Sequence, residues 1–155
     1  MSLSQNDLES YLWGGATILR GTIDAGDYKQ LIFPLLFFKR ISDVWDEEYQ
    51  QALEESGNDL EYAAFAENHR FQMPEGAHWK DVRAVTSSVG RALQNAMRAI
   101  EQANPDKLHG IFGDAQWTNK ERLSDETLRD LLAHFSAQTL STESVPEDPF
   151  GQAYA

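Results

Sequence analysis

Cysteine is absent from the 155 residues of this chain, which excludes disulfide bonds and metal sites with thiolate ligands. Histidine offers no clear alternative, because the four histidines lie nine, 31 and 25 residues apart and no pair shares a helical turn. We therefore expect ordinary core or surface roles for His69, His78, His109 and His134, and we predict no metal site.

Basic residues are scarce: 13 Lys and Arg stand against 25 Asp and Glu, for a formal net charge of −12. Such a surface repels polyanions and argues against free-standing nucleic-acid binding. Residues 43–68 hold nine acids and no Lys or Arg, which predicts a solvated face or, alternatively, a surface for a basic partner. Residues 16–42 hold four basic residues and two acids, so we expect any DNA contact there or at Arg83, Arg91 and Arg98.

Long hydrophobic runs are missing as well. The most apolar stretch, residues 31–38, contains a proline and is far shorter than the ~20 residues of a membrane-spanning helix. Residues 1–7 do not combine a basic segment with an apolar one, as a secretion signal would. A hydrophobic content of 41% predicts one packed domain. We expect a soluble, cytoplasmic protein with no membrane partner.

Motifs that carry chemistry are also lacking. Gly14-Gly15 and the segment 110–113 match neither the dinucleotide nor the P-loop fingerprint, and no nucleophile elbow is present. Asn104-Pro105-Asp106 has only part of the Asn-Pro-Pro-aromatic motif of amino-methyltransferases, so we interpret it as the end of a helix. We therefore predict no catalytic and no cofactor-binding residue in this chain.

Five stretches have the apolar spacing of helices. The first begins at Ser4, where Asp7 completes a weak capping box, and ends near Gly21. Gly14-Gly15 falls inside it and predicts either a break or the close approach of another helix.

The second helix is the longest, from Asp27 to about Ser56, with Gly57 as a left-handed stop. Its first half is apolar nearly all round, which is typical of the central helix of a bundle. Pro34 removes one backbone hydrogen bond and is expected to kink it.

Three shorter helices follow. Asn58 with Glu61 suggests a capping box at the start of a helix that continues through residue 66. An extended segment is expected at 69–74, and after it the Trp79 side chain is expected to fill part of the core. The clearest periodicity, residues 89–100, ends at Asn104-Pro105, and Ser124 caps the last helix after a loop at 110–119.

The prediction is an all-α bundle of about five to seven helices with at most one small hairpin. Residues 1–138 form the helical domain, and the polar residues 139–155 form a linker.

The order of certain residues resembles the N-terminal domain of the modification (M) subunit of type I restriction-modification enzymes. The most specific block comprises Leu12-Trp13, Ala16, Ile18-Leu19-Arg20-Gly21, Asp24, Asp27-Tyr28-Lys29, Ile32, Leu35-Leu36-Phe37 and Lys39-Arg40-Ile41-Ser42-Asp43. Weaker matches follow in order: Phe71, Pro74, Trp79, Ile100-Glu101, Asn104-Pro105, Leu108, Gly110-Ile111-Phe112, Leu128, Leu131, Phe135, Asp148, Phe150-Gly151 and Ala153-Tyr154. Gly14-Gly15 and Phe150 depart from the usual pattern.

This resemblance implies a helical domain that precedes a Rossmann-like catalytic domain, which binds S-adenosylmethionine and methylates adenine N6 after flipping the base. The glycine-rich Asp-Pro-…-Gly-Ser-Gly motif and the complete Asn-Pro-Pro-aromatic motif of that domain are absent here. We thus expect a fragment that is inactive alone, with the catalytic part beginning where this chain ends. The implied partners are a specificity (S) subunit, a second M subunit, restriction (R) subunits and double-stranded DNA.

The resemblance also implies a role in closing the complex around DNA and in packing between subunits. Arg20, Lys29, Lys39 and Arg40 are the candidates for DNA or subunit contact. The alternative for Lys39 and Arg40 is solvent exposure, or pairing with Asp43 and Asp46 along the helix.

Two other functions stay open from the sequence. One is a stand-alone helical module for protein interaction or regulation. The other is an unrelated helical enzyme that uses surface carboxylates such as Glu47 and Glu48, although solvation is the ordinary role of such pairs.

Overall fold

A computed structural model describes residues 4–21 and 23–140, and within these ranges the chain is all-α with no strand. The described elements are α1 (Gln5–Leu19), η1 (Ala25–Asp27), α2 (Tyr28–Ser56), α3 (Leu60–Ala63), η2 (Ala66–Asn68), α4 (Trp79–Arg83), α5 (Val89–Ala103) and α6 (Asp125–Phe135), where η denotes a 3-10 turn. The predicted all-α bundle of five to seven helices is confirmed by these six α-helices. Residues 141–155, most of the predicted linker, lie outside the described residues.

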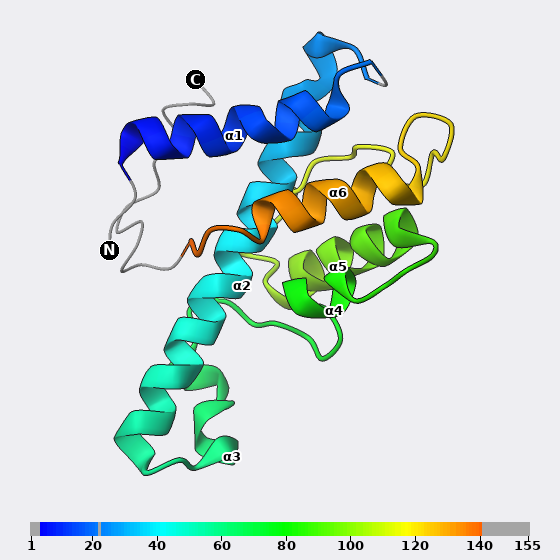
Figure 1. The fold of residues 1–155 in the computed structure, drawn as a ribbon. Helices are drawn as coiled ribbons and strands as arrows, with labels where there is room; N and C mark the ends of the chain where they lie inside the picture. The colour runs from blue at the N-terminus through cyan, green and yellow to red at the C-terminus, as the bar shows by residue number, and fades with distance from the viewer. Residues whose placement is uncertain (1–3, 22, 141–155) are drawn as a thin grey trace.

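Helix α2 is the central element of the bundle (Figure 1). Its 29 residues span about 44 Å at ~1.5 Å per residue. Helix α1 crosses it near its beginning, α4, α5 and α6 lie beside its middle, and α3 packs on its far end (Figure 1). In the described ranges, no helix combines the length and the apolar character needed to cross a bilayer.

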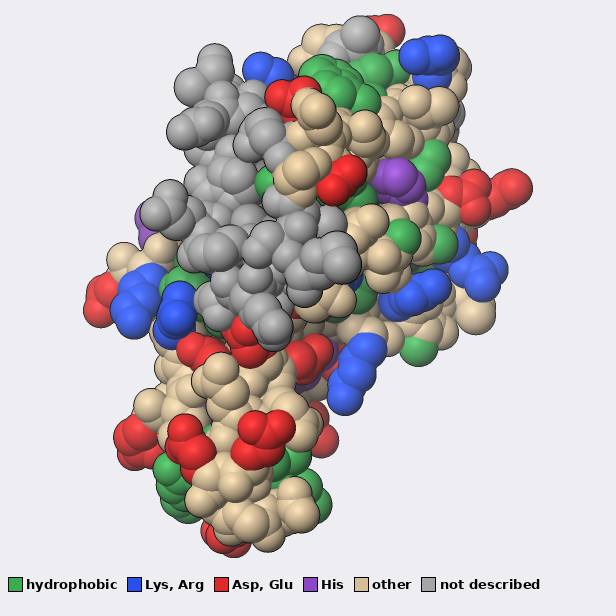
Figure 2. Space-filling view, turned by 60° about the vertical axis from the view of Figure 1, so that its left-hand side comes forward, with side chains coloured by type: hydrophobic (Ala, Val, Ile, Leu, Met, Phe, Trp, Pro, Cys, Tyr) green, Lys and Arg blue, Asp and Glu red, His purple; other side chains and the backbone are tan. Residues whose placement is uncertain are grey.

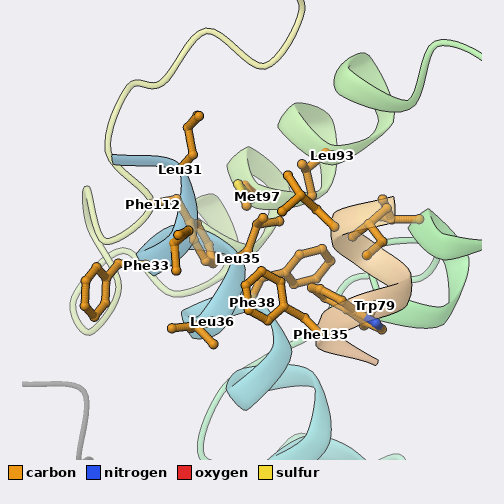
Figure 3. Packing of buried hydrophobic residues seen from close by; sticks show 14 of the residues in the cluster. Leu31, Phe33, Leu35, Leu36, Phe38, Trp79, Leu93, Met97, Phe112 and Phe135 are labelled. Atoms are coloured by element: carbon orange, nitrogen blue, oxygen red, sulfur yellow. The ribbon is translucent and has the colours of Figure 1, made fainter. Parts of the chain in front are cut away.

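The hydrophobic core forms where the first half of α2 meets α4, α5, α6 and the loop before α6 (Figure 3). The ring of Phe38 lies 5.2 Å from that of Trp79 and 6.3 Å from that of Phe112, between ring centroids, both edge-on. Leu35, Leu36 and Phe38 are fully buried. The prediction of a central helix that is apolar nearly all round is thereby confirmed.

The ends of the long helices follow the predicted signals. The Ser4 hydroxyl accepts a hydrogen bond from the Asp7 N–H (3.0 Å), while the Asp7 carboxylate accepts one from the Ser4 N–H (3.3 Å). Gly57 ends α2 in the left-handed region with φ of 69°, and the Ser124 hydroxyl caps α6 by accepting from the Thr127 N–H. Short polar side chains and a glycine therefore set these boundaries as expected.

Helix α3 differs from the prediction in its cap and its length. The residue that caps it is Asp59, whose carboxylate accepts from the Tyr62 N–H (3.1 Å), and not Asn58. Asn58 follows Gly57 in the left-handed region (φ 71°), so the chain turns twice before the cap is reached. The helix ends at Ala63, and η2 replaces the predicted continuation to residue 66.

Helix α4 was not predicted as a helix. Trp79 does plug the core, but it also begins a helix of five residues, which is too short for an apolar period to be visible. The Asp81 carboxylate supports its start by accepting from the His78 N–H (3.1 Å). Helix α2 continues as one element through Pro34.

Gly14 and Gly15 lie where α6 crosses α1. A β-carbon added to Gly14 would stand 2.4 Å from the His134 ring, and one added to Gly15 would stand 2.4 Å from the Phe135 ring. Of the two predicted explanations for this pair, the close approach of another helix is the one that the structure shows. Helix α1 runs through both glycines without a break.

Candidate interaction surfaces

Arg20 and Lys29 are exposed at the end of the molecule where α1 meets α2. Arg20 is the C-cap residue that follows α1, and Lys29 lies in the first turn of α2. Both side chains are exposed to solvent, and the end of α2 that carries α3 lies at the opposite extreme of the molecule (Figure 1). These two predicted contact residues therefore lie at the same end of the molecule, and solvent reaches both of them.

Lys39, in contrast, is inside the protein, with 5% of the residue exposed. Its ammonium group pairs with the Asp43 carboxylate one turn further along α2 and donates to the Gln138 carbonyl (2.7 Å). The Lys39 ammonium group is thus occupied by contacts within the chain. The alternative drawn from the sequence, a pair with Asp43 along the helix, is what the structure contains.

Arg40 and Asp43 bind the chain just beyond α6. The Arg40 guanidinium donates to the Leu140 carbonyl (2.9 Å), and the Asp43 carboxylate accepts from the Leu140 N–H (2.8 Å). Leu140 itself is fully buried, although the predicted linker began at residue 139. We call the side chains of Lys39, Arg40 and Asp43 the exit latch, because together they hold residues 138–140 against α2.

No local pattern in the sequence predicts the exit latch. Its partners follow 97 to 100 residues later in the chain, so only the Lys39–Asp43 spacing was visible. The latch nevertheless coincides with residues 39–43, the last part of the most specific block of the resemblance. Within that segment Ile41 is buried, and Ser42 takes part in a second link.

Ser42 connects α2 to α4 and α6. Its hydroxyl accepts from the Trp79 N–H (3.1 Å), and the Trp79 indole N–H donates to the Ser136 hydroxyl (2.8 Å). Ser136 in turn donates to the Leu132 carbonyl (2.7 Å). The end of α6 is therefore held by the link through Trp79 as well as by the exit latch.

Helices α1 and α6 are joined by a reciprocal pair of hydrogen bonds. The Tyr11 hydroxyl donates to the Phe135 carbonyl at the end of α6, and the His134 Nε2–H donates to the Tyr11 carbonyl (2.7 Å). Burial raises the pKa of the Tyr11 hydroxyl, so it stays a donor throughout the pH range of a folded protein. These bonds explain why α6 approaches α1 closely enough to require Gly14 and Gly15.

A shallow hollow of about 280 Å³ lies between α1 and α2, beside the exposed Lys29. Trp13 stands at this hollow with 62% of its surface exposed. The residues that line it are mainly apolar: Glu9, Leu12, Trp13, Tyr28, Lys29, Ile32 and Phe33. This end of the molecule thus combines basic side chains with an aromatic surface.

The histidines form no ligand set in the part of the chain that the structure describes, where no group of three potential metal-binding side chains occurs. His69 is buried, donates its Nε2–H to the Ala63 carbonyl (2.8 Å), and stacks on Trp45 at 4.2 Å between ring centroids. His78 packs edge-on to the same Trp45, and its burial lowers its pKa. These two residues have a structural role at the junction between the core and the far end of α2.

A protein-family model covers most of this helical bundle. The family model described as the HsdM N-terminal domain matches residues 8–135, from the first turns of α1 to the last residue of α6. A comparison with curated proteins finds no match. The matched region includes residues 39–43, Ser42 and Trp79 of the second link, and most of α1 together with all of α6. The chain therefore belongs to the family of HsdM N-terminal domains, the N-terminal part of the M subunit of type I restriction-modification methyltransferases.

Proposed function

We propose that this chain is the assembly and DNA-clamping domain of an M subunit that methylates adenine N6 with S-adenosylmethionine, and that it transfers no methyl group itself. The observation that carries the proposal is that Arg20 and Lys29 are both exposed at the α1–α2 end of the molecule, where Lys29 also lines the apolar hollow next to Trp13. Clustered basic side chains are what a phosphate backbone requires. The proposed partners are duplex DNA, the S subunit, a second M subunit and the R subunit.

The residues present do not fit the methyl donor. The chain has no glycine-rich Asp-Pro-…-Gly-Ser-Gly segment, and Asn104, the one position that partly matches the base-binding motif, is used for structure. Its amide donates to the Ile100 and Gln72 carbonyls (2.8 Å each) and accepts from the Gln72 N–H (2.7 Å). We therefore derive no step of methyl transfer through this chain.

The exit latch supports an assembly role. It fixes the position and direction of residues 138–140 relative to α2, and α2 also carries Lys29. In an M subunit whose catalytic domain follows, the chain toward that domain would leave the helical bundle at a fixed point beside α2.

The test is charge reversal at the proposed DNA surface in the M subunit assembled with its partners. Changing Arg20→Glu and Lys29→Glu should weaken duplex binding and should reduce the slope of log affinity against log salt by about one for each phosphate that is no longer neutralised. The sequence preference should stay the same, because phosphate contacts position the protein without specifying bases. Binding is measured by fluorescence anisotropy across a salt series.

Lys80→Glu is the matched control, since Lys80 is exposed on α4, away from the α1–α2 hollow. It changes the net charge as each single variant does but should leave the salt slope unchanged. An unchanged slope in the Arg20 and Lys29 variants, or an altered sequence preference, would contradict the proposal.

A further inference from the structure

The end of the molecule around α3 exposes apolar side chains that the fold does not use. Leu60 is 64% exposed and Phe65 is 45% exposed, and the Phe65 ring packs edge-on to Tyr62 at 5.9 Å between centroids. Among the described residues only Trp13, at the other end of the molecule, is a comparably exposed large hydrophobic residue. Single exposed hydrophobic residues are ordinary, but a group of them on a protruding end is typical of a partner surface.

Local bonds hold this end of the chain in place. Gly57 and Asn58 both adopt positive φ to turn the chain back, and the Asp59 carboxylate caps α3. The buried His69 then ties the segment to the Ala63 carbonyl. Leu60 and Phe65 are therefore presented on a fixed scaffold at the end of α2, outside the main hydrophobic core.

The surroundings of these apolar side chains are acidic. Five exposed acids lie in the same segment: Glu54, Glu55, Asp59, Glu61 and Glu67. No Lys or Arg occurs between residues 43 and 68, and Arg70, the next basic residue, already pairs with Glu48 (3.4 Å). Figure 2 shows acidic and hydrophobic side chains side by side on this end of the molecule. Such a surface repels DNA and anionic membranes and attracts cationic groups.

We propose that Leu60, Phe65 and the five surrounding acids, here called the acidic tip, dock a protein segment that carries apolar side chains flanked by Lys or Arg. The apolar contact supplies most of the affinity, and the acids steer and orient the cationic flanks. A helix with one basic and one apolar face has this chemistry. The proposal does not depend on the proposed DNA surface, which lies at the opposite end of the molecule.

The experiment uses a designed Lys/Leu amphipathic peptide as the probe and the 155-residue chain labelled at one site. Because the chain has no cysteine, Gln51→Cys on the exposed face of α2 accepts a single fluorophore near the acidic tip. Replacing both apolar residues (L60S with F65S) should weaken peptide binding by about tenfold or more, as expected when central apolar side chains are removed. Both residues are exposed, so thermal unfolding should not change.

Charge variants and a second peptide make the test specific. E61Q with E67Q should weaken binding of the Lys/Leu peptide, whereas E121Q with E126Q, an equal charge change on exposed acids elsewhere, should not. A Lys/Ser peptide of the same charge should bind far more weakly than the Lys/Leu peptide. Equal binding of the Lys/Leu peptide by the L60S/F65S chain and the parent would overturn the proposal. So would equal binding of the two peptides by the parent.

Discussion

At the scale of single residues, Asp125 shows how one side chain can serve two helices. It is the first residue of α6, yet its carboxylate accepts from the Ser88 N–H (3.1 Å) and the Val89 N–H (3.0 Å) at the start of α5. These bonds to the charged form, that from Val89 above all, lower the pKa of Asp125. The sequence predicted Asp125 as an acid in the first turn of a helix but contained no sign of its partners on α5.

This geometry predicts a pH dependence of stability. The pKa of Asp125 in the folded protein lies below the ordinary value of ~3.9. Its contribution to the free energy of unfolding is therefore complete above pH ~3.9 and is lost as the pH falls through the folded-state pKa. Asp125→Asn should therefore be less stable than the parent at pH 7, and the difference should shrink toward pH 3. Urea unfolding of the variant and the parent at a series of pH values measures the difference at pH 7 and its decrease toward pH 3.

Asp130→Asn is the matched control, since Asp130 is exposed on the same helix. It should show no comparable pH-dependent difference. A constant difference between Asp125→Asn and the parent from pH 7 to pH 3 would mean that the carboxylate charge does not stabilise the start of α5.

At the scale of elements, close approaches between segments explain positions that helix propensity alone does not. Gly90 lies inside α5, where alanine would ordinarily favour the helix by ~1 kcal/mol. A β-carbon there would stand only 1.9 Å from the backbone carbonyl oxygen of Trp117. A backbone atom cannot rotate away as a side chain can. In a chain with alanine at position 90, the loop that carries the buried Trp117 would therefore have to shift.

Gly90→Ala should therefore lower the free energy of unfolding by about 2 kcal/mol, the typical cost of overpacking a core. Gly26→Ala is its control, because no atom lies within 4 Å of the β-carbon that it adds. Both are measured by urea unfolding. A Gly90→Ala chain as stable as the parent would show that the contact between α5 and this loop is loose.

The exit latch gives a second prediction at this scale. Asp43→Ala leaves the Lys39 ammonium buried with only a carbonyl partner and removes the acceptor for the Leu140 N–H. Breaking a buried ion pair in this way should lower the free energy of unfolding by about 3 kcal/mol. Amide hydrogen exchange at Leu140 should also become faster. Asp46→Ala, a change at an exposed acid one turn further along α2, should have neither effect.

The same scale shows what the sequence could and could not predict. The long helices, their caps at Ser4 and Ser124 and the central place of α2 follow from local periodicity and were predicted. The short helix α4 was missed because five residues are too few to show an apolar period. The cap at Asp59 was missed because Gly57 and Asn58 both adopt positive φ, which moves the start of α3 by one residue without leaving a sign in the sequence. The burial of Lys39 was missed because it depends on Gln138, far along the chain.

At the scale of the whole molecule, chemical character is separated along α2. The α1–α2 end exposes Arg20, Lys29 and Trp13. The middle of α2 binds residues 138–140, which follow α6, and the far end of α2 is acidic. This separation of charge was visible in the sequence as a basic third followed by an acidic block. Its arrangement on one long helix fits a domain that bridges different partners, as the proposed function requires.

Whether this helical domain carries methyl-transfer chemistry is measured by the incorporation of labelled methyl groups from S-adenosylmethionine into duplex DNA by the 155-residue chain alone. No incorporation is expected above the level without protein, while an assembled type I methyltransferase assayed in parallel incorporates label. Incorporation into adenine by the purified chain would contradict the proposed function, because the residues of this helical domain would then carry chemistry as well as contacts.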